Sequence, residues 1–100
     1  MTSDTQDISV ANQPERNRYE LSSAGSLAGF LAYRRREGSL DLVHTEILPE
    51  YEGKGLAAQL VREALDDLRA CGQKMVPSCS YVATFVQRHP QYQDLVAPGA

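Results

Sequence analysis

A glycine turn in the middle of the chain carries the clearest chemical pattern. Residues 52–57 read Glu-Gly-Lys-Gly-Leu-Ala and join an extended apolar segment at 40–48 to an amphipathic stretch at 55–70. A strand, a glycine turn and a helix N-terminus in this order leave backbone N–H groups unpaired, and they present the positive end of a helix dipole, about half a charge. Because Ala57 and Ala58 are small, a phosphate can approach the backbone closely. The pattern predicts an anion-binding loop.

Two phosphate-binding motifs do not fit this turn. The Gly-Lys-Ser/Thr ending of a P-loop and the three-glycine dinucleotide fingerprint are both missing from the sequence. A tight turn without a ligand is therefore an alternative interpretation of residues 53–55.

Five side chains near the turn are candidates for proton transfer or nucleophilic chemistry. Asp41, His44 and Glu46 lie on the predicted strand before the turn, and two-residue alternation places His44 and Glu46 on the face opposite Asp41. Histidine titrates near neutral pH and suits a general base. On the segment after the helix, Cys79 is a core residue, a pocket-lining group or a nucleophile, and Tyr81 is a general acid or a core aromatic. The three residues on the strand before the turn also have interpretations without a catalytic role. Asp41 is then a turn cap, His44 a half-buried strand residue and Glu46 a solvated side chain.

The elements that position these groups follow from the periodicity of the apolar residues. Strands are predicted at 18–21, 26–36 and 40–48, and another at 74–82 follows the helix at 55–70. A short helix is expected at 82–89, and residues 1–16 are predicted to be a disordered tail, with Ile8 and Val10 as the possible start of a strand. The prediction is an α+β domain at 17–100, in which an antiparallel meander joins a β-α-β unit whose last strand runs parallel to the third.

Composition excludes several functional classes. The net charge of −3 argues against broad nucleic-acid binding, and no apolar run reaches the roughly 20 residues of a membrane span. Two cysteines without a secretory signal predict reduced thiols and a cytoplasmic location. No pairs of Cys and His have the spacing of a metal site. The basic run 34–36 is expected to be a solvated hairpin tip, with contact to a ligand phosphate as the weaker alternative.

Residues 43–57 (Val-His-Thr-Glu-Ile-Leu-Pro-Glu-Tyr-Glu-Gly-Lys-Gly-Leu-Ala), with Leu-Val at 60–61 and Pro-Ser-Cys-Ser-Tyr-Val at 77–82, resemble the GNAT superfamily of acetyl-CoA-dependent N-acetyltransferases. The resemblance covers about residues 18–96 and is strongest to the small, single-domain YjdJ-type branch. The loop of that superfamily reads Gln/Arg-x-x-Gly-x-Gly/Ala. Gly55 and Ala57 match its fourth and sixth positions, whereas Glu52 occupies the first and departs from the pattern.

This resemblance implies a GNAT-like fold with splayed central strands, a CoA site and a mechanism. The backbone of Glu46, Ile47 and Leu48 would hold pantetheine, and the N–H groups of residues 53–58 (Gly53, Lys54, Gly55, Leu56, Ala57 and Ala58) would hold the pyrophosphate. An amine then attacks the thioester directly, with Asp41 or His44 as the base, Tyr81 as the acid and Cys79 near the acetyl group.

The expected function is acetyl transfer to an amine by a small acyltransferase. The chain is short for the superfamily, which implies an open acceptor cleft suited to a protein or peptide lysine. Two alternatives stay open: a CoA-binding regulatory module with little or no turnover, and an interaction domain whose glycine turn binds nothing.

Overall fold

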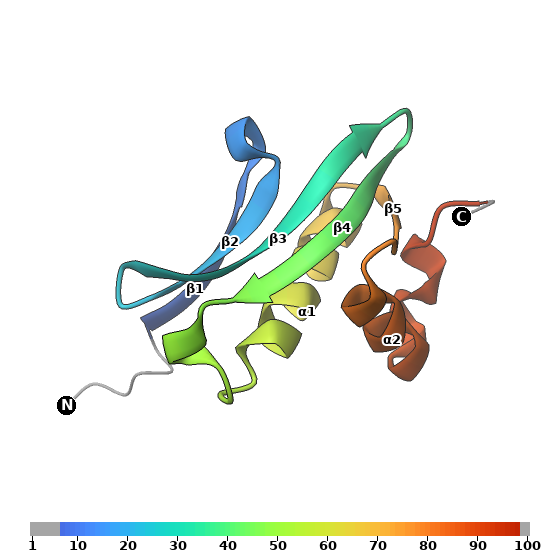
Figure 1. The fold of residues 1–100 in the computed structure, drawn as a ribbon. Helices are drawn as coiled ribbons and strands as arrows, with labels where there is room; N and C mark the ends of the chain where they lie inside the picture. Colours follow the sequence, from blue (N-terminus) through green and yellow to red (C-terminus); the bar gives the residue numbers. More distant parts are fainter. Residues whose placement is uncertain (1–6, 99–100) are drawn as a thin grey trace.

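The computed structural model describes residues 7–98 and contains one five-stranded sheet in the order β1-β2-β3-β4-β5 (Figure 1). Neighbouring strands are antiparallel from β1 to β4, and β5 is parallel to β4. The elements in chain order are β1 (Ile8–Gln13), η2 (Pro14–Arg16), β2 (Arg18–Ser23), β3 (Ser26–Arg36), β4 (Ser39–Ile47), η3 (Pro49–Tyr51), α1 (Leu56–Ala70), β5 (Lys74–Val76), α2 (Ser80–Arg88) and η4 (Pro90–Leu95). The predicted α+β meander with a β-α-β unit is confirmed.

The predicted disordered tail is wrong for part of its length. Ile8–Gln13 form β1, which pairs in antiparallel register with the whole of β2, from Ile8 opposite Ser23 to Gln13 opposite Arg18. The segment is polar because one side of this edge strand is exposed, while Ile8 and Val10 pack against the core. Residues 1–6 of the expected tail lie outside the described residues.

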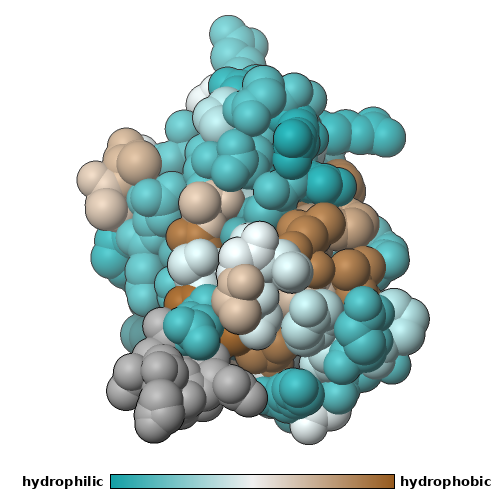
Figure 2. Space-filling view, turned by 90° about the vertical axis from the view of Figure 1, so that its left-hand side faces the viewer, coloured by the Kyte–Doolittle hydropathy of each residue, from teal (hydrophilic) through white to brown (hydrophobic). Residues whose placement is uncertain are grey.

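Helix α1 and the inner face of the sheet form the core. Apolar residues of α1 recur at three- and four-residue spacing, and the buried ones are Leu56, Leu60, Val61, Ala64, Leu65 and Leu68. They pack against sheet residues such as Tyr19, Leu31 and Leu42. In Figure 2 the face at the left of Figure 1 is mostly hydrophilic, with a few hydrophobic residues reaching the surface near its centre. Gly72, which follows the Cys71 C-cap of the helix, has a φ of +68°, a conformation that favours glycine after a helix end.

A β-bulge in β4 changes which side chains share a face. Leu42 pairs with Tyr33 and His44 pairs with Ala32, so Val43 is the extra residue and the two-residue alternation shifts there. Asp41 pairs with Arg34, and therefore lies on the same outer face as His44 and Glu46. The prediction that Asp41 occupies the opposite face is wrong, because a one-residue bulge cannot be read from alternation.

The last predicted strand is correct only for its first three residues. Lys74–Val76 pair with Ser39–Asp41, and Ser78 N–H then donates to Val76 O (3.0 Å) in a tight turn centred on Pro77. Helix α2 begins at Ser80, two residues before the predicted helix, because Val82, Phe85 and Val86 bury one helical face. Strands β4 and β5 consequently separate after Asp41, which gives the splayed arrangement.

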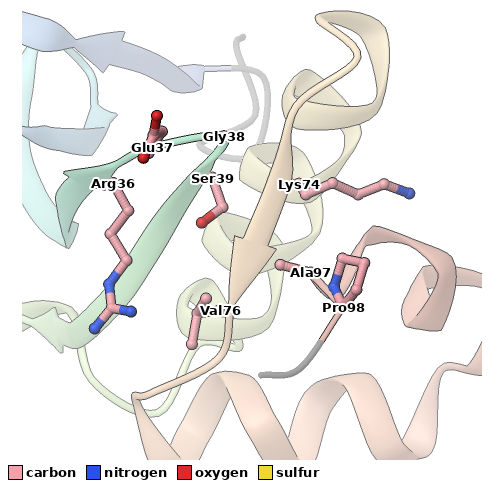
Figure 3. A pocket seen from close by; sticks show the side chains of 8 residues that line it. All are labelled: Arg36, Glu37, Gly38, Ser39, Lys74, Val76, Ala97 and Pro98. Carbon is pink, nitrogen blue, oxygen red and sulfur yellow. The ribbon is translucent and has the colours of Figure 1, made fainter.

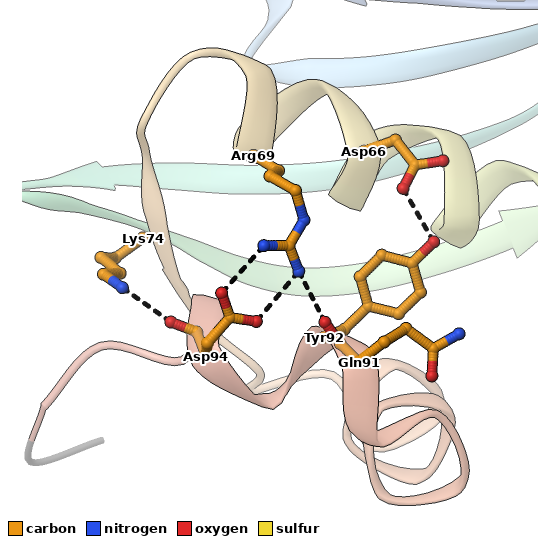
Figure 4. Close-up of polar contacts among 6 residues, drawn as sticks. All are labelled: Asp66, Arg69, Lys74, Gln91, Tyr92 and Asp94. Atoms are coloured by element: carbon orange, nitrogen blue, oxygen red, sulfur yellow. Dashed lines mark hydrogen bonds and ion pairs between the residues drawn. The ribbon is translucent and has the colours of Figure 1, made fainter.

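The C-terminal turn η4 is fixed to α1 by a polar cluster (Figure 4). Arg69 donates two hydrogen bonds to the Asp94 carboxylate (2.8 and 2.9 Å), and Tyr92 Oη donates to Asp66 (2.8 Å). The Arg69 guanidinium lowers the pKa of the Asp94 carboxyl. Burial, followed by the bond to Asp66, raises the pKa of Tyr92. This cluster holds η4 beside α1 and α2, so the last part of the chain supports the position of α2.

Candidate functional site

The turn before α1 presents a row of backbone N–H groups. Gly53 and Gly55 have φ values of +82° and +74°, conformations that favour glycine, and Gly55 is the N-cap of α1. Among the described residues, no backbone carbonyl or side chain accepts from the N–H groups of residues 53–58. A Cβ at Gly53 or Gly55 would meet no atom within 4 Å, so the space in front of the turn is open. This row of N–H groups, which we call the cradle, fits an anionic ligand.

Two neighbouring side chains set the charge of the cradle. Lys54 places its Nζ 5.9 Å from the centroid of the Tyr51 ring, so one cation stays beside the cradle. Glu52 is exposed, and its N–H donates to Pro49 O (3.3 Å) in η3. The Glu52 carboxylate therefore lies in solvent, before the first unpaired N–H group, which suits a cradle that acts through its backbone.

The edge of β4 that faces away from β3 is unpaired between the cradle and Cys79. Pairing with β5 covers only Ser39–Asp41. Leu48 N–H donates to Ala28 O (2.8 Å) on the β3 side, and alternation places the backbone of Glu46 on that side too. The backbone groups of Thr45 and Ile47 point the other way, toward the open edge. The structure thus adds Thr45 to the residues on the open edge. Sequence reasoning missed Thr45, because the bulge that decides which backbone groups face this edge leaves no signal in the sequence.

Cys79 lies where β4 and β5 separate, as the N-cap of α2. Its N–H donates to Leu42 O (2.8 Å), and its Sγ is 3.5 Å from Thr45 Oγ1. Burial tends to raise the pKa of the Cys79 thiol, but hydrogen bonds from the Thr45 hydroxyl and from the N–H groups of Val82, Tyr81 and Thr45 outweigh it and lower the pKa. The predicted strand position of Cys79 is wrong, and the thiol is instead half-buried at a helix N-terminus.

Asp41 is held in a structural arrangement. It is 5% exposed, it accepts a short hydrogen bond from Ser78 Oγ, and one of its oxygens is 3.3 Å from Arg36 Nη2. These contacts tie the turn before Cys79 to β4. Because both partners already engage the carboxylate, the geometry favours a positioning role over that of a base.

His44 and Glu46 form a pair on the outer face of β4. His44 Nε2 lies 3.1 Å from Glu46 Oε1, and the side chains are 57% and 48% exposed. Neighbouring residues on this face include Phe30, whose ring centroid is 6.0 Å from that of His44. The structure therefore places a histidine and a carboxylate that can orient it side by side on β4, the strand with the open edge.

Tyr81 does not lie beside His44 and Glu46 on β4 but at the start of α2. Its side chain is 41% exposed and lines a cavity between α1 and α2 together with Ala58 and Arg62.

A larger cavity of about 640 Å³ lies at the opposite end of β4, beneath the β3–β4 hairpin (Figure 3). Its lining includes Arg36, Ser39 and Lys74, and Figure 3 shows the Arg36 and Lys74 side chains pointing away from each other. Because β4 spans roughly 30 Å, this cavity is remote from the cradle.

The comparison with protein families decides the class. Residues 18–95 match the family model described as GCN5-related N-acetyl-transferase. The chain belongs to the GCN5-related N-acetyltransferase family. Over 61 residues it is 34% identical to protein NATD1 of Bos taurus and of Homo sapiens, a match that covers 59% of this chain and 54% of each relative. The chain thus spans about half the length of these relatives.

Solved structures share the fold. A GCN5-like protein from Staphylococcus aureus superposes with a TM-score of 0.68 at 18% identity, covering 91% of this chain and 89% of its own. A GNAT-family acetyltransferase from Brucella melitensis, solved in complex with acetyl-CoA, superposes with a TM-score of 0.52 at 23% identity, covering 68% of this chain and 50% of its own. The expected GNAT fold and membership of the acetyltransferase family are confirmed, whereas the YjdJ-type branch stays a prediction.

Within residues 7–98, no helix is long and apolar enough to cross a membrane. Within the same range, no three side chains of His, Cys, Asp or Glu gather in a way that could hold a metal ion. Both cysteines are free thiols.

Proposed function

We propose that the chain is an acetyl-CoA-dependent N-acetyltransferase that transfers the acetyl group to a protein or peptide lysine. The observation that carries the proposal is the cradle, six successive N–H groups (53–58) without a protein acceptor among residues 7–98, placed directly beside the open edge of β4. Family membership supplies the reaction class. We also assign the chain to the small YjdJ-type branch and to a reducing, cytoplasmic setting, which suits its two free thiols.

The cradle and the open edge would hold different parts of CoA. The N–H groups of 53–58 would bind the pyrophosphate, which gains from the positive end of the α1 dipole. Amide groups of pantetheine would then hydrogen-bond the Thr45 carbonyl and the backbone of Ile47 on the open edge, since the Thr45 N–H is bonded to the Cys79 thiol. We favour these two residues over Leu48, because the Leu48 N–H is already bonded to Ala28 O. This path leads from the cradle toward Cys79 at the separation of β4 and β5.

Direct attack by the acceptor amine is the proposed chemistry. His44, oriented by Glu46, would take the proton of the attacking amine, while the amine nitrogen bonds to the thioester carbonyl carbon. The carbon–sulfur bond then breaks, and the CoA thiolate leaves. A thiol has a pKa of roughly 8.5, so this leaving group needs little help from an acid. Tyr81 lies in the groove between α1 and α2, so we assign the acid role to no side chain.

A two-step route is the second candidate, favoured by the lowered pKa of the Cys79 thiol. In that route the Cys79 thiolate attacks the thioester, CoA leaves as its thiol, and the amine then takes the acetyl group from the cysteine. Both routes have the same net reaction, in which acetyl-CoA and an amine give the acetylated amine and free CoA. They differ in whether an acetyl group can be trapped on Cys79 before any acceptor is present.

The proposed acceptor follows from the exposed outer face. His44 and Glu46 are about half exposed, and α1 packs on the opposite face of the sheet. The chain forms only the short η2, and no α-helix, between β1 and β2. An open surface of this kind suits a lysine presented by a macromolecule better than an enclosed metabolite. A regulatory CoA-binding module without turnover is the alternative function.

Ligand-induced stabilisation tests CoA binding. At a hundredfold excess of CoA over Kd the domain should gain about 2.7 kcal/mol, or roughly 10–20 °C in Tm. Gly55→Glu should abolish this gain, because its carboxylate would enter the cradle. Gly38→Glu is the matched control, since Gly38 also has a positive φ (+80°) and an open surrounding but lies in the β3–β4 hairpin. Absence of any shift with CoA or acetyl-CoA would refute binding.

Turnover separates the enzyme from the regulatory module. Thiol release from acetyl-CoA should accelerate when a lysine-peptide library is added, and acetylated small polyamines without any acetylated peptide would contradict the proposed acceptor. Incubation without an acceptor, followed by mass spectrometry, separates the two chemical routes. An acetyl group on Cys79 would replace direct attack by the two-step route.

A further inference from the structure

Strand β1 leaves one of its two edges unpaired. It is the outermost strand of the sheet, and among the described residues only β2 pairs with it (Figure 1). Ala24 N–H donates to Asp7 O (3.2 Å), which fixes the alternation of the hydrogen bonds between β1 and β2. The backbone groups of Ile8, Val10 and Asn12 therefore point away from β2, toward the free edge.

This edge lacks the features that usually protect an edge strand. Natural proteins block such edges with charged side chains, proline or a bulge. The sequence of β1, Ile-Ser-Val-Ala-Asn-Gln, contains no charge and no proline, and it pairs with β2 from Ile8 to Gln13 without a bulge. The free edge of β1 can therefore accept a further strand.

An acidic cavity lies between this edge strand and α1. It encloses about 400 Å³, and its lining includes residues 10–12 of β1 and three carboxylates of α1, those of Glu63, Asp66 and Asp67. Among the described residues, no Lys, Arg or His lines it or forms a salt bridge with one of these carboxylates. The cavity therefore adds negative charge beside the unpaired backbone groups.

The contacts of the three carboxylates fix their positions without neutralising them. Each accepts a hydrogen bond from an uncharged group: Glu63 from Gln59 Nε2 (2.9 Å), Asp66 from Tyr92 Oη (2.8 Å) and Asp67 from Tyr19 Oη (2.7 Å). The two arginines of α1 have other neighbours, since Arg69 binds Asp94 and the Arg62 guanidinium lies 5.9 Å from the Phe85 ring centroid. A cationic partner is what this arrangement fits.

We propose that β1 binds an extended segment of another protein as a sixth strand, with Lys or Arg at alternate positions contacting Glu63, Asp66 and Asp67. Hydrogen bonds to the backbone of β1 supply affinity, and because strand side chains alternate, every second residue of the segment faces α1. A second copy of this chain fits less well, because antiparallel pairing of β1 with itself would bring two sets of the same carboxylates toward each other. The site lies at the edge of the sheet opposite β5, and it requires neither CoA nor acetyl transfer.

Fluorescence anisotropy without CoA tests the choice of partner. The probe is a short labelled peptide in which Lys alternates with Thr, and a peptide of the same composition with its lysines in one block should bind more weakly. The triple variant Glu63→Gln, Asp66→Asn, Asp67→Asn keeps the side-chain sizes and hydrogen-bond acceptors. It should raise the Kd about tenfold, because each exposed ion pair contributes a factor of roughly 1.5 to 5.

A second triple variant is the matched control. Glu37→Gln, Glu50→Gln and Glu52→Gln remove three exposed carboxylates that do not line the cavity. At about 0.15 M salt, where distant charges are screened, this variant should leave the Kd unchanged. Absence of peptide binding, or equal weakening in both triple variants, would overturn the proposal and would leave the proposed acetyl transfer untouched.

Residue-resolved amide hydrogen exchange tests the added strand. Bound peptide should slow exchange at Ile8, Val10 and Asn12, whereas the N–H groups of Ser9 and Ala11 already bond to β2 and should change little. Peptide binding without this alternation would show that charge alone holds the segment, which would refute strand addition. Dimerisation that slows the same three amides and excludes the peptide would assign the edge to a second copy instead.

Discussion

Gly29 of β3 lies close against the backbone of β4, and replacing it with alanine tests the geometry of the open edge. A Cβ at this position would lie 2.6 Å from Ile47 Cδ1 and 2.7 Å from Glu46 O. The methyl group of Ile47 can rotate away, but the carbonyl belongs to the backbone of β4. Overpacking of this kind costs about 1–3 kcal/mol. At roughly 4–8 °C per kcal/mol, Gly29→Ala should lower the Tm by about 5–20 °C.

The same substitution should weaken CoA binding beyond its effect on stability. To relieve the clash, β4 must move at Glu46 and Ile47, which adjoin the open edge proposed to hold pantetheine. Gly72→Ala is the control: Gly72 has a φ of +68° and no atom within 4 Å of an added Cβ, so the loss there, about 1–2 kcal/mol, comes from backbone strain alone. Gly72 lies at the far end of α1, and its variant should bind CoA normally.

Thermal and urea unfolding, followed by CoA titration, measure both effects. An unchanged Tm for Gly29→Ala would show that the strands do not approach as described. A destabilised variant that still binds CoA as tightly as the Gly72→Ala control would refute the reasoning that links this part of β4 to the ligand.

Three further predictions concern single side chains. In a Cys71→Ser background, the alkylation rate of Cys79 should have a pH midpoint below the value of about 8.5 for a free thiol, because hydrogen bonds stabilise the thiolate. Thr45→Val should raise that midpoint, because it removes one of these hydrogen bonds. A midpoint at or above about 8.5 in the unmodified site would contradict the hydrogen-bond geometry. His44→Gln should lower kcat by about 100-fold or more with no change in CoA affinity, and a normal rate would exclude His44 as the base. Arg69→Ala should accelerate amide hydrogen exchange in η4 but not in the sheet, and equal acceleration throughout would contradict a local role for the bond to Asp94.

Sequence patterns predict the parts of this fold that depend on local periodicity. The helix at 55–70 has apolar residues at three- and four-residue spacing and a glycine at each end, and α1 matches it within one residue. The hairpin at 36–39 is equally local, because Gly38 supplies the positive φ of the turn. The anion-binding turn follows from the same local information.

The parts that failed depend on contacts between distant residues. Segment 74–82 is rich in β-formers, yet the chain leaves the sheet after Val76, because burial of Val82 and Phe85 beside α1 outweighs strand propensity. The bulge at Val43 is set by pairing with β3, and it moves Asp41 to the face of His44. β1 is too polar to be recognised alone, and it exists because β2 supplies a partner.

The proposed site follows from the early end of β4–β5 pairing. If β5 continued beyond Val76, its backbone would occupy the edge at Thr45 and Ile47, and Cys79 would lie within a strand. Because the chain turns into α2 instead, the helix N-terminus points its N–H groups at the Cys79 thiol, and the β4 edge requires water or a ligand as its partner. A ligand with amide groups can replace that water without leaving donors unpaired. The same departure from the sheet therefore creates both the binding edge and the lowered thiol pKa.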